Sequence, residues 1–265
     1  MPRFFLSPMN LRDDANPSDS GVITGKEAHH LIAVHRHVVG DVIEVVSGAQ
    51  VFRAVITGVS AGEVSVMFTE QLVSPETKLE VTLLQGMPKG DKLEFIIQKA
   101  VELGVVRVMP VACSRSIATL PHAKAAARVT RWQAIASEAA KQSGRAIVPE
   151  IGLPLDFSLA VAQATASLKL VAYEVDGHGL KEVLRRTSAG GSIGSVVCLV
   201  GPEGGLSRDE VDRAHAYGFI PVTLGPRILR TETAALALLS TVMYELGDMG
   251  GQNDDGGVSH PRLQS

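Results

Sequence analysis

The sequence predicts an α/β protein of two unequal domains, in which a small β-rich domain precedes a larger domain with a parallel sheet. The chain has 265 residues, which is more than one domain usually holds. Short β-branched runs separated by turn residues fill roughly the first 70 positions. After Ser74 and Pro75, strand-like runs alternate with helix-like segments, as in parallel βαβ units. We therefore assign residues 1–74 to the first domain and 75–247 to the second.

The first domain is predicted to contain one helix and a series of hairpins. Thr24 followed by Glu27 has the spacing of a capping box, so we expect a helix from about residue 25 to 37, ended by Gly40. Runs of Val, Ile and Phe then predict strands over 42–46, 51–56 and 63–68. Such closely spaced strands favour a small barrel or closed sheet.

The second domain begins with a strand, a helix and a strand. Apolar residues over 79–85 and 105–111 predict the two strands. Between them, Leu93, Ile96 and Ile97 begin an apolar pattern of helical period that continues to Val101, and Gly104 ends the helix. An alanine-rich segment then predicts a long helix over 122–142.

The C-terminal part repeats the alternation. Strands are predicted over 168–173, 196–200 and 220–224. Ser207 and Glu210 form a second capping box, which starts a helix ending at Gly218. A largely apolar helix follows over 233–246. The last residues, 248–265, are rich in Gly, Asp and Asn without a core pattern, so we expect a disordered tail.

Composition indicates a cytoplasmic protein. The chain does not open with a secretion signal, and the longest apolar segment, 234–246, is shorter than the roughly 20 residues that cross a bilayer. Cys113 and Cys198 lie far apart, in neither a metal-binding nor a disulfide pattern. We also expect no metal site among His29, His30, His35 and His37, because no Cys or carboxylate set completes one.

The charge distribution bears on nucleic-acid binding. The net charge of -3 argues against indiscriminate binding, which needs an excess of Lys and Arg. Residues 75–150, however, hold 11 basic and 7 acidic side chains, whereas the flanking segments are net acidic. If RNA binds, this middle segment is the better platform; solvated helix faces are the alternative.

A glycine loop, Gly201 to Gly205, follows a buried-type strand. Such loops often let a ligand approach the backbone at the carboxyl edge of a parallel sheet. A phosphate-binding loop is excluded, since Pro202 lacks an N–H, Glu203 is acidic and no lysine follows. A dinucleotide site would place its glycines after the first strand of the domain. Two interpretations of the loop remain: a binding site for a neutral or cationic adenosyl ligand, and a tight turn that binds no ligand.

A second loop, Leu224 to Ala234, concentrates charge before an apolar helix. Arg227, Arg230 and Glu232 flank the apolar pair Ile228 and Leu229. Half-buried charges of this kind need a partner or a chemical role. Arg230 and Glu232 could alternatively form a structural pair with each other.

Together with the segments 89–104 and 131–145, these two loops resemble the bacterial 16S ribosomal RNA (uracil-N3)-methyltransferases, which belong to the SPOUT, or α/β-knot, class. The similarity extends over roughly residues 3–246 and is most specific at Leu224 to Ala234. The resemblance implies a PUA-like RNA-binding barrel at the N-terminus, a C-terminal trefoil knot and a homodimer. His35 departs from the family pattern, which usually has an apolar residue there.

The resemblance also implies S-adenosylmethionine as the cofactor and a uridine of 16S ribosomal RNA, within the assembled small subunit, as the substrate. Glu174 is expected near the floor of the cofactor pocket. The cofactor-binding residues carried over from the family are Tyr173, Leu199, Val200, Gly201, Gly204, Gly205, Leu224, Gly225, Ile228, Leu229, Arg230 and Ala234.

Arg230 is the candidate for stabilising the anionic base, and Glu232 either orients it or acts as the general base. The candidates for phosphate contacts are exposed-type basic residues, which could also be merely solvated: Arg36, Lys89, Arg115 and Arg145. Two other functions stay open: a SPOUT methyltransferase acting on transfer RNA, and a non-catalytic RNA-binding or ribosome-assembly factor. Calorimetry with S-adenosylmethionine separates the last from the enzymes.

Overall fold

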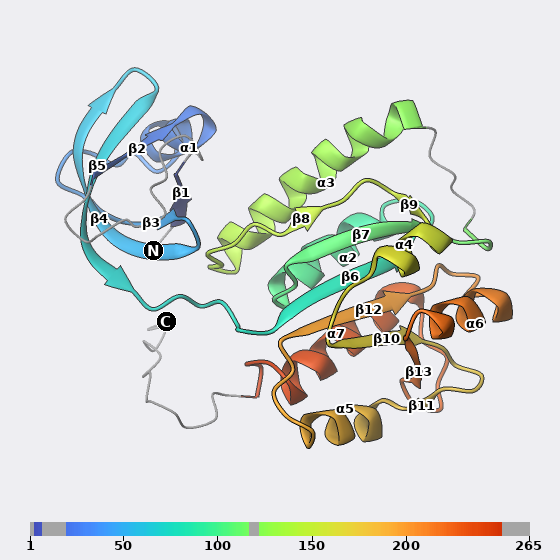
Figure 1. The fold of residues 1–265 in the computed structure, drawn as a ribbon. Coiled ribbons are helices and arrows are strands. Elements are labelled where there is room, and N and C mark those ends of the chain that lie inside the picture. The colour runs from blue at the N-terminus through green and yellow to red at the C-terminus, as the bar shows by residue number, and fades with distance from the viewer. Residues whose placement is uncertain (1–2, 7–19, 117–121, 251–265) are drawn as a thin grey trace. The chain divides into compact units, whose positions relative to one another are not determined.

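The structure, a computed structural model, describes residues 3–6, 20–116 and 122–250 (Figure 1). It divides into two compact units. Unit 1 comprises the described residues within 1–76 and 126–151, and unit 2 those within 77–125 and 152–265. The tail predicted to be disordered lies, beyond Gly250, outside the described residues.

Unit 1 contains a small curled sheet in the order β1-β3-β4-β5-β2. Its antiparallel strands β3 (Val42–Ser47), β4 (Gln50–Ser60) and β5 (Glu63–Leu72) confirm the three predicted strands. Two register shifts between β4 and β5 mark bulges, which bend a strand and increase its twist. The edges are β1 (Arg3–Phe5), parallel to β3, and β2 (Ser20–Thr24), antiparallel to β5. Both edge strands are too short for a periodicity signal.

The predicted helix of unit 1 is shorter than expected. It consists of α1 (Gly25–His29) and a π-helical turn, η2 (His30–Val34), rather than a helix to residue 37. Arg36 has a φ of 56°, in the left-handed region, which ends the helical path. Thr24 is the N-cap, but its side chain makes no capping hydrogen bond, so the predicted capping box is wrong.

The long helix α3 (His122–Gln142) has the predicted bounds, and its residues from 126 onward belong to unit 1, as does the short strand β8 (Glu150–Ile151). Trp132, Ala136 and Ala139 are buried along one side of α3. This spacing of four and three residues is that of an amphipathic helix.

Unit 2 is built on a parallel sheet in the order β11-β13-β10-β12-β6-β7, with β9 beside β7. The five strands predicted from apolar runs are confirmed: β6 (Glu80–Gly86), β7 (Arg107–Ala112), β10 (Leu168–Ala172), β12 (Ser195–Val200) and β13 (Ile220–Thr223). The short strands β9 (Leu155–Asp156) and β11 (His178–Gly179) are additional. The predicted α/β class is therefore confirmed.

Five helices complete unit 2. The helices α4 (Phe157–Gln163) and α6 (Arg208–Ala216) contact each other, while α7 (Thr231–Glu245) contacts α2 (Lys92–Glu102) and α5 (Leu180–Ser188). Figure 1 shows α4 and α6 in front of the sheet and α7 behind it. The capping box of α6 is confirmed, since Ser207 Oγ accepts from the Glu210 N–H at 3.2 Å and the Glu210 carboxylate accepts from the Ser207 N–H at 2.8 Å.

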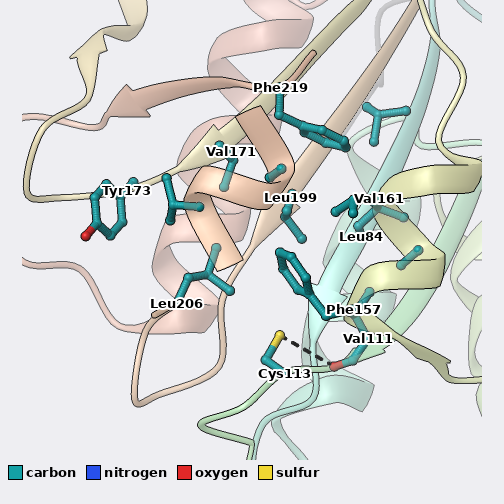
Figure 2. Close-up of a cluster of buried hydrophobic side chains, with 14 residues drawn as sticks. Leu84, Val111, Cys113, Phe157, Val161, Val171, Tyr173, Leu199, Leu206 and Phe219 are labelled. Carbon is teal, nitrogen blue, oxygen red and sulfur yellow. Dashed lines mark hydrogen bonds between the residues drawn. The ribbon is translucent and has the colours of Figure 1, made fainter. Parts of the chain in front are cut away.

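A buried apolar cluster fixes the face of the sheet that carries α4 and α6 (Figure 2). Leu84 and Leu199 from the central strands meet Phe157 from α4 and Phe219, which follows α6. Cys113 belongs to the same cluster; burial, reinforced by the charge of Glu210, raises the pKa of its thiol to about 12. Cys113 is therefore an inert core residue rather than a reactive thiol.

None of the helices described by the structure is both long and apolar enough to cross a membrane.

Candidate active site

A cavity of about 440 Å³ opens in unit 2 where three neighbouring parallel strands end. Ala172, Val200 and Thr223, the last residues of β10, β12 and β13, contribute to its wall. The carboxyl edge of a parallel sheet is the usual place for a ligand, and the volume is that of a small-molecule site, about 300–1,000 Å³.

The glycine loop Gly201–Gly205 lies directly against the end of β6. A Cβ atom on Gly86 would lie 2.6 Å from the backbone nitrogen of Pro202 and 2.8 Å from the carbonyl carbon of Gly201. Only a residue without a side chain permits this approach. Gly205 has a φ of 70°, so the loop also turns through the left-handed region. The backbone conformation of the loop is thus fixed by its contact with β6 and by the turn at Gly205.

A buried polar network joins this loop to the second loop. Thr231 Oγ1 donates to the carbonyl oxygen of Gly201 at 2.6 Å and accepts from Gln85 Nε2 at 2.9 Å. Gln85 is fully buried and Thr231 is nearly so. Because Thr231 stands between Arg230 and Glu232 in the chain, the network fixes the segment that carries both candidate catalytic residues. Arg230 lines the cavity, whereas Glu232 lies beside it, facing the lining residue Lys92. Sequence reasoning missed this network, although Gln85 is a polar residue at the end of an apolar strand.

The structure gathers the predicted cofactor residues around one cavity, with one exception. Leu199 is fully buried inside the sheet and does not line the cavity, so its predicted contact with the cofactor is not supported. Its side chain belongs to the apolar cluster of Figure 2. The predicted residues that line the cavity are Tyr173, Glu174, Val200, Gly201, Gly204, Gly205, Leu224, Gly225, Ile228, Leu229, Arg230 and Ala234.

Arg230 and Glu232 do not form the structural pair that the sequence left open. Arg230 is exposed at the cavity, and among the described residues its guanidinium has no ion-pair or hydrogen-bond partner. Glu232 instead faces Lys92, with 3.7 Å between the carboxylate Oε2 and Nζ. The arginine is therefore available to a ligand.

Lys92, which the sequence did not single out, also holds the glycine loop. Its Nζ lies 3.0 Å from Glu203 Oε1, and the Lys89 N–H donates to the same oxygen at 3.1 Å. Partial burial alone would raise the pKa of Glu203, but the hydrogen bonds and charge of Lys92, with backbone N–H donors, lower it. A carboxylate and an ammonium thus form one side of the cavity.

Comparison with known proteins shows the family. A family model described as an RNA methyltransferase domain matches residues 75–243. The ribosomal RNA small subunit methyltransferase E of Bacillus subtilis (strain 168) is 36% identical over 252 residues, which cover 92% of this chain and 97% of the relative. The chain belongs to this family of RNA methyltransferases.

Solved structures of relatives cover almost the whole chain. The ribosomal RNA small subunit methyltransferase E of Neisseria gonorrhoeae, bound to S-adenosyl methionine, superposes with a TM-score of 0.80 at 32% identity, over 94% of this chain and 99% of its own. A putative methyltransferase of Legionella pneumophila, in complex with the same cofactor, gives 0.79 at 29% identity, over 93% and 98%. The family inferred from the two loops is thereby confirmed.

Three of the four candidate phosphate contacts of this methyltransferase are exposed. Arg36 lies just after the helical segment of unit 1, and Lys89 lies in the loop before α2. Arg115 Nη1 donates to the carbonyl oxygen of Gly204 at 3.0 Å, so this arginine also supports the glycine loop. Their contact with RNA stays a prediction.

Arg145 has a different role from the one predicted. Its side chain is only 7% exposed and pairs with Glu76, itself 12% exposed, with 2.6 Å between Nη2 and Oε2. Glu76 also accepts from the Ala146 and Ile147 N–H groups. A guanidinium buried in such a pair cannot reach a phosphate, so we correct its assignment to a structural residue of unit 1.

Replacing Arg145 by alanine should therefore destabilise the protein. Removing one partner of a buried pair leaves a buried charge, which costs about 3–5 kcal/mol. Arg53 and Glu70 form an exposed pair in the same unit, 46% and 53% exposed, so Arg53→Ala should cost at most about 1 kcal/mol. Urea unfolding of the two variants measures both losses; equal losses would contradict the structural role of Arg145.

Proposed function

We propose that this protein transfers the methyl group of S-adenosylmethionine to N3 of a specific uridine in the 16S ribosomal RNA of the small ribosomal subunit. The observation that carries the proposal is Arg230, which has no partner in the part of the chain that the structure describes and lies at a cavity lined by two glycine-containing loops. The names of the relatives and the S-adenosylmethionine bound in two of them support the substrate and the cofactor.

The cavity fits an adenosyl cofactor in shape and charge. Leu224, Ile228 and Leu229 supply apolar wall, and the glycine loop offers backbone groups without side chains in the way. The carboxylate of Glu174 suits a ligand that carries positive charge and disfavours a phosphate. S-adenosylmethionine bound here supplies an electrophilic methyl group on a cationic sulfur.

Methylation at N3 requires the base to lose the N3 proton as the nitrogen lone pair bonds to the methyl carbon and the carbon–sulfur bond breaks. Negative charge therefore develops on the uracil ring. Arg230 can donate two N–H groups to a uracil oxygen and stays charged at any working pH. Glu232, two residues away, orients this arginine or accepts the proton.

The target uridine must be unpaired or flipped out to reach such a cavity. Arg36, Lys89 and Arg115 are the candidates for contacts with the surrounding phosphates. The assembled small subunit as substrate agrees with the net charge of -3, which is low for a protein that binds naked RNA.

The finer features of the architecture are inferred from the same resemblance to the (uracil-N3)-methyltransferases. We propose a PUA-like barrel for residues 1–74, a trefoil knot at the C-terminal end of the 75–247 domain, and a homodimer located in the cytoplasm.

Mass mapping of methylated nucleosides tests the proposal. Small-subunit RNA and transfer RNA are compared between cells with and without this protein. We expect N3-methyluridine to disappear from the 16S RNA alone. Loss of a methylated nucleoside from transfer RNA would favour the alternative substrate, and unchanged methylation would favour a non-catalytic RNA-binding factor.

A further inference from the structure

Lys92 occupies a position that helix stability does not explain. It is the first residue of α2, where the unsatisfied N–H groups make the helix end positive. A lysine there is unfavourable for the helix. By contrast, Lys99, in the last turn of the same helix, pairs with Glu102 at 2.7 Å and suits the negative end.

The surroundings of Lys92 supply another reason for its position. Its ammonium faces Glu203 from the glycine loop, at 3.0 Å, and Glu232 from the first turn of α7, at 3.7 Å. The three side chains are 34%, 28% and 21% exposed, so water screens their charges only in part. One ammonium therefore forms ion pairs with two carboxylates that come from different segments of the chain.

The two contacts differ in kind. Lys92 donates a hydrogen bond to Glu203, whereas the distance to Glu232 is too long for one. Glu232 Oε2 is buried, and the described residues give it no hydrogen-bond donor. Its charge is balanced by Lys92 at a distance, while its lone pairs stay free to accept a proton or to orient a neighbouring donor.

We propose that Lys92 is a positioning residue for methyl transfer, whose single ammonium holds Glu203 and Glu232 and compensates part of their charge beside the cavity. Among the described residues Arg230 has no carboxylate partner, so its charge is available to an anionic base there. Without Lys92, two uncompensated carboxylates would lie near a base that is becoming negative and would oppose its deprotonation. This inference rests on the proposed function.

Lys92→Met tests the proposal, with Lys99→Met as the matched control from the same helix. Methyl transfer to isolated small subunits gives kcat and KM, and calorimetry gives the Kd of S-adenosylmethionine. We expect Lys92→Met to lower kcat by about 10- to 100-fold, with the Kd of the cofactor within about threefold of the control. Lys92→Arg, which keeps the charge, should recover most of the rate.

A double variant separates charge compensation from a mechanical link. If Lys92 acts by compensating charge, adding Glu203→Gln to Lys92→Met removes one uncompensated carboxylate and should raise kcat severalfold. If Lys92 only ties the loop to α7, the second substitution gives no recovery, and the proposal is overturned. Lys92→Gln gives the same comparisons if the methionine variant does not fold.

The outcomes also separate this proposal from the proposed function. If the unaltered protein and Lys99→Met methylate the RNA and Lys92→Met does so equally well, only the role of Lys92 fails. If the unaltered protein binds S-adenosylmethionine and transfers no methyl group, the proposed function fails and the role of Lys92 with it.

Discussion

Replacing Arg230 by alanine should lower kcat by about 10²- to 10³-fold, as the loss of one donor to a developing anion typically does. Binding of S-adenosylmethionine should change by less than about threefold, because the cavity keeps its apolar walls and its glycine loop. The substitution should also leave the fold intact, since the Arg230 side chain makes no capping hydrogen bond to α7. Single-turnover transfer at saturating cofactor measures the loss.

Two further variants make this expectation specific. Arg230→Lys keeps the charge without the planar pair of donors and should restore only part of the rate. Arg227 lines the same cavity and is also exposed, so Arg227→Ala tests general positive charge at the cavity. A loss of kcat with Arg227→Ala as large as with Arg230→Ala would contradict the specific role of Arg230 in the mechanism.

Replacing Gly86 by alanine should damage cofactor binding through the backbone alone. The new methyl group would lie 2.6 Å from the Pro202 nitrogen, so the glycine loop must move or β6 must bend. Overpacking of this kind costs about 1–3 kcal/mol of stability. If the displacement reaches the cavity, affinity for S-adenosylmethionine falls by about tenfold or more, since 1.4 kcal/mol is a factor of ten.

Gly194 offers the matched control for that substitution. It precedes β12 in the same unit, and a Cβ there would meet no atom within 4 Å. Gly194→Ala should leave both the free energy of unfolding and the cofactor affinity nearly unchanged. Equal behaviour of the two variants in urea unfolding and calorimetry would show that the loop does not depend on its contact with Gly86.

The parallel sheet and its helices were predictable because each element carries a local signal. Apolar runs predicted β6, β10 and β12, and the Ser207 and Glu210 pair marked the start of α6. The strand β11 was missed because two residues hold too little periodicity. The helix α5 was also missed, although Leu180, Val183 and Leu184 have helical spacing and are buried. The same spacing that succeeded at Ser207 failed at Thr24, where a π-helical continuation follows a helix of one turn.

The sequence predicted which chain segments form the candidate site, but it did not predict the contacts between them. The two loops identified the cavity because glycine and paired charge are local features. The roles of Lys92, Gln85 and Arg145 depend on partners more than 65 positions away in sequence, as with Glu203, Thr231 and Glu76. Such contacts arise only from the folded topology. Arg145, in particular, is indistinguishable in sequence from an exposed arginine.

Methyl transfer by the purified protein tests the central claim most directly. Isolated small ribosomal subunits that lack the modification are incubated with the protein and S-adenosylmethionine carrying a labelled methyl group, and the nucleosides are then separated. We predict that the label appears in N3-methyluridine at a single position of the 16S RNA. Binding of the cofactor without labelled N3-methyluridine, or label on another nucleoside, would contradict the proposed function.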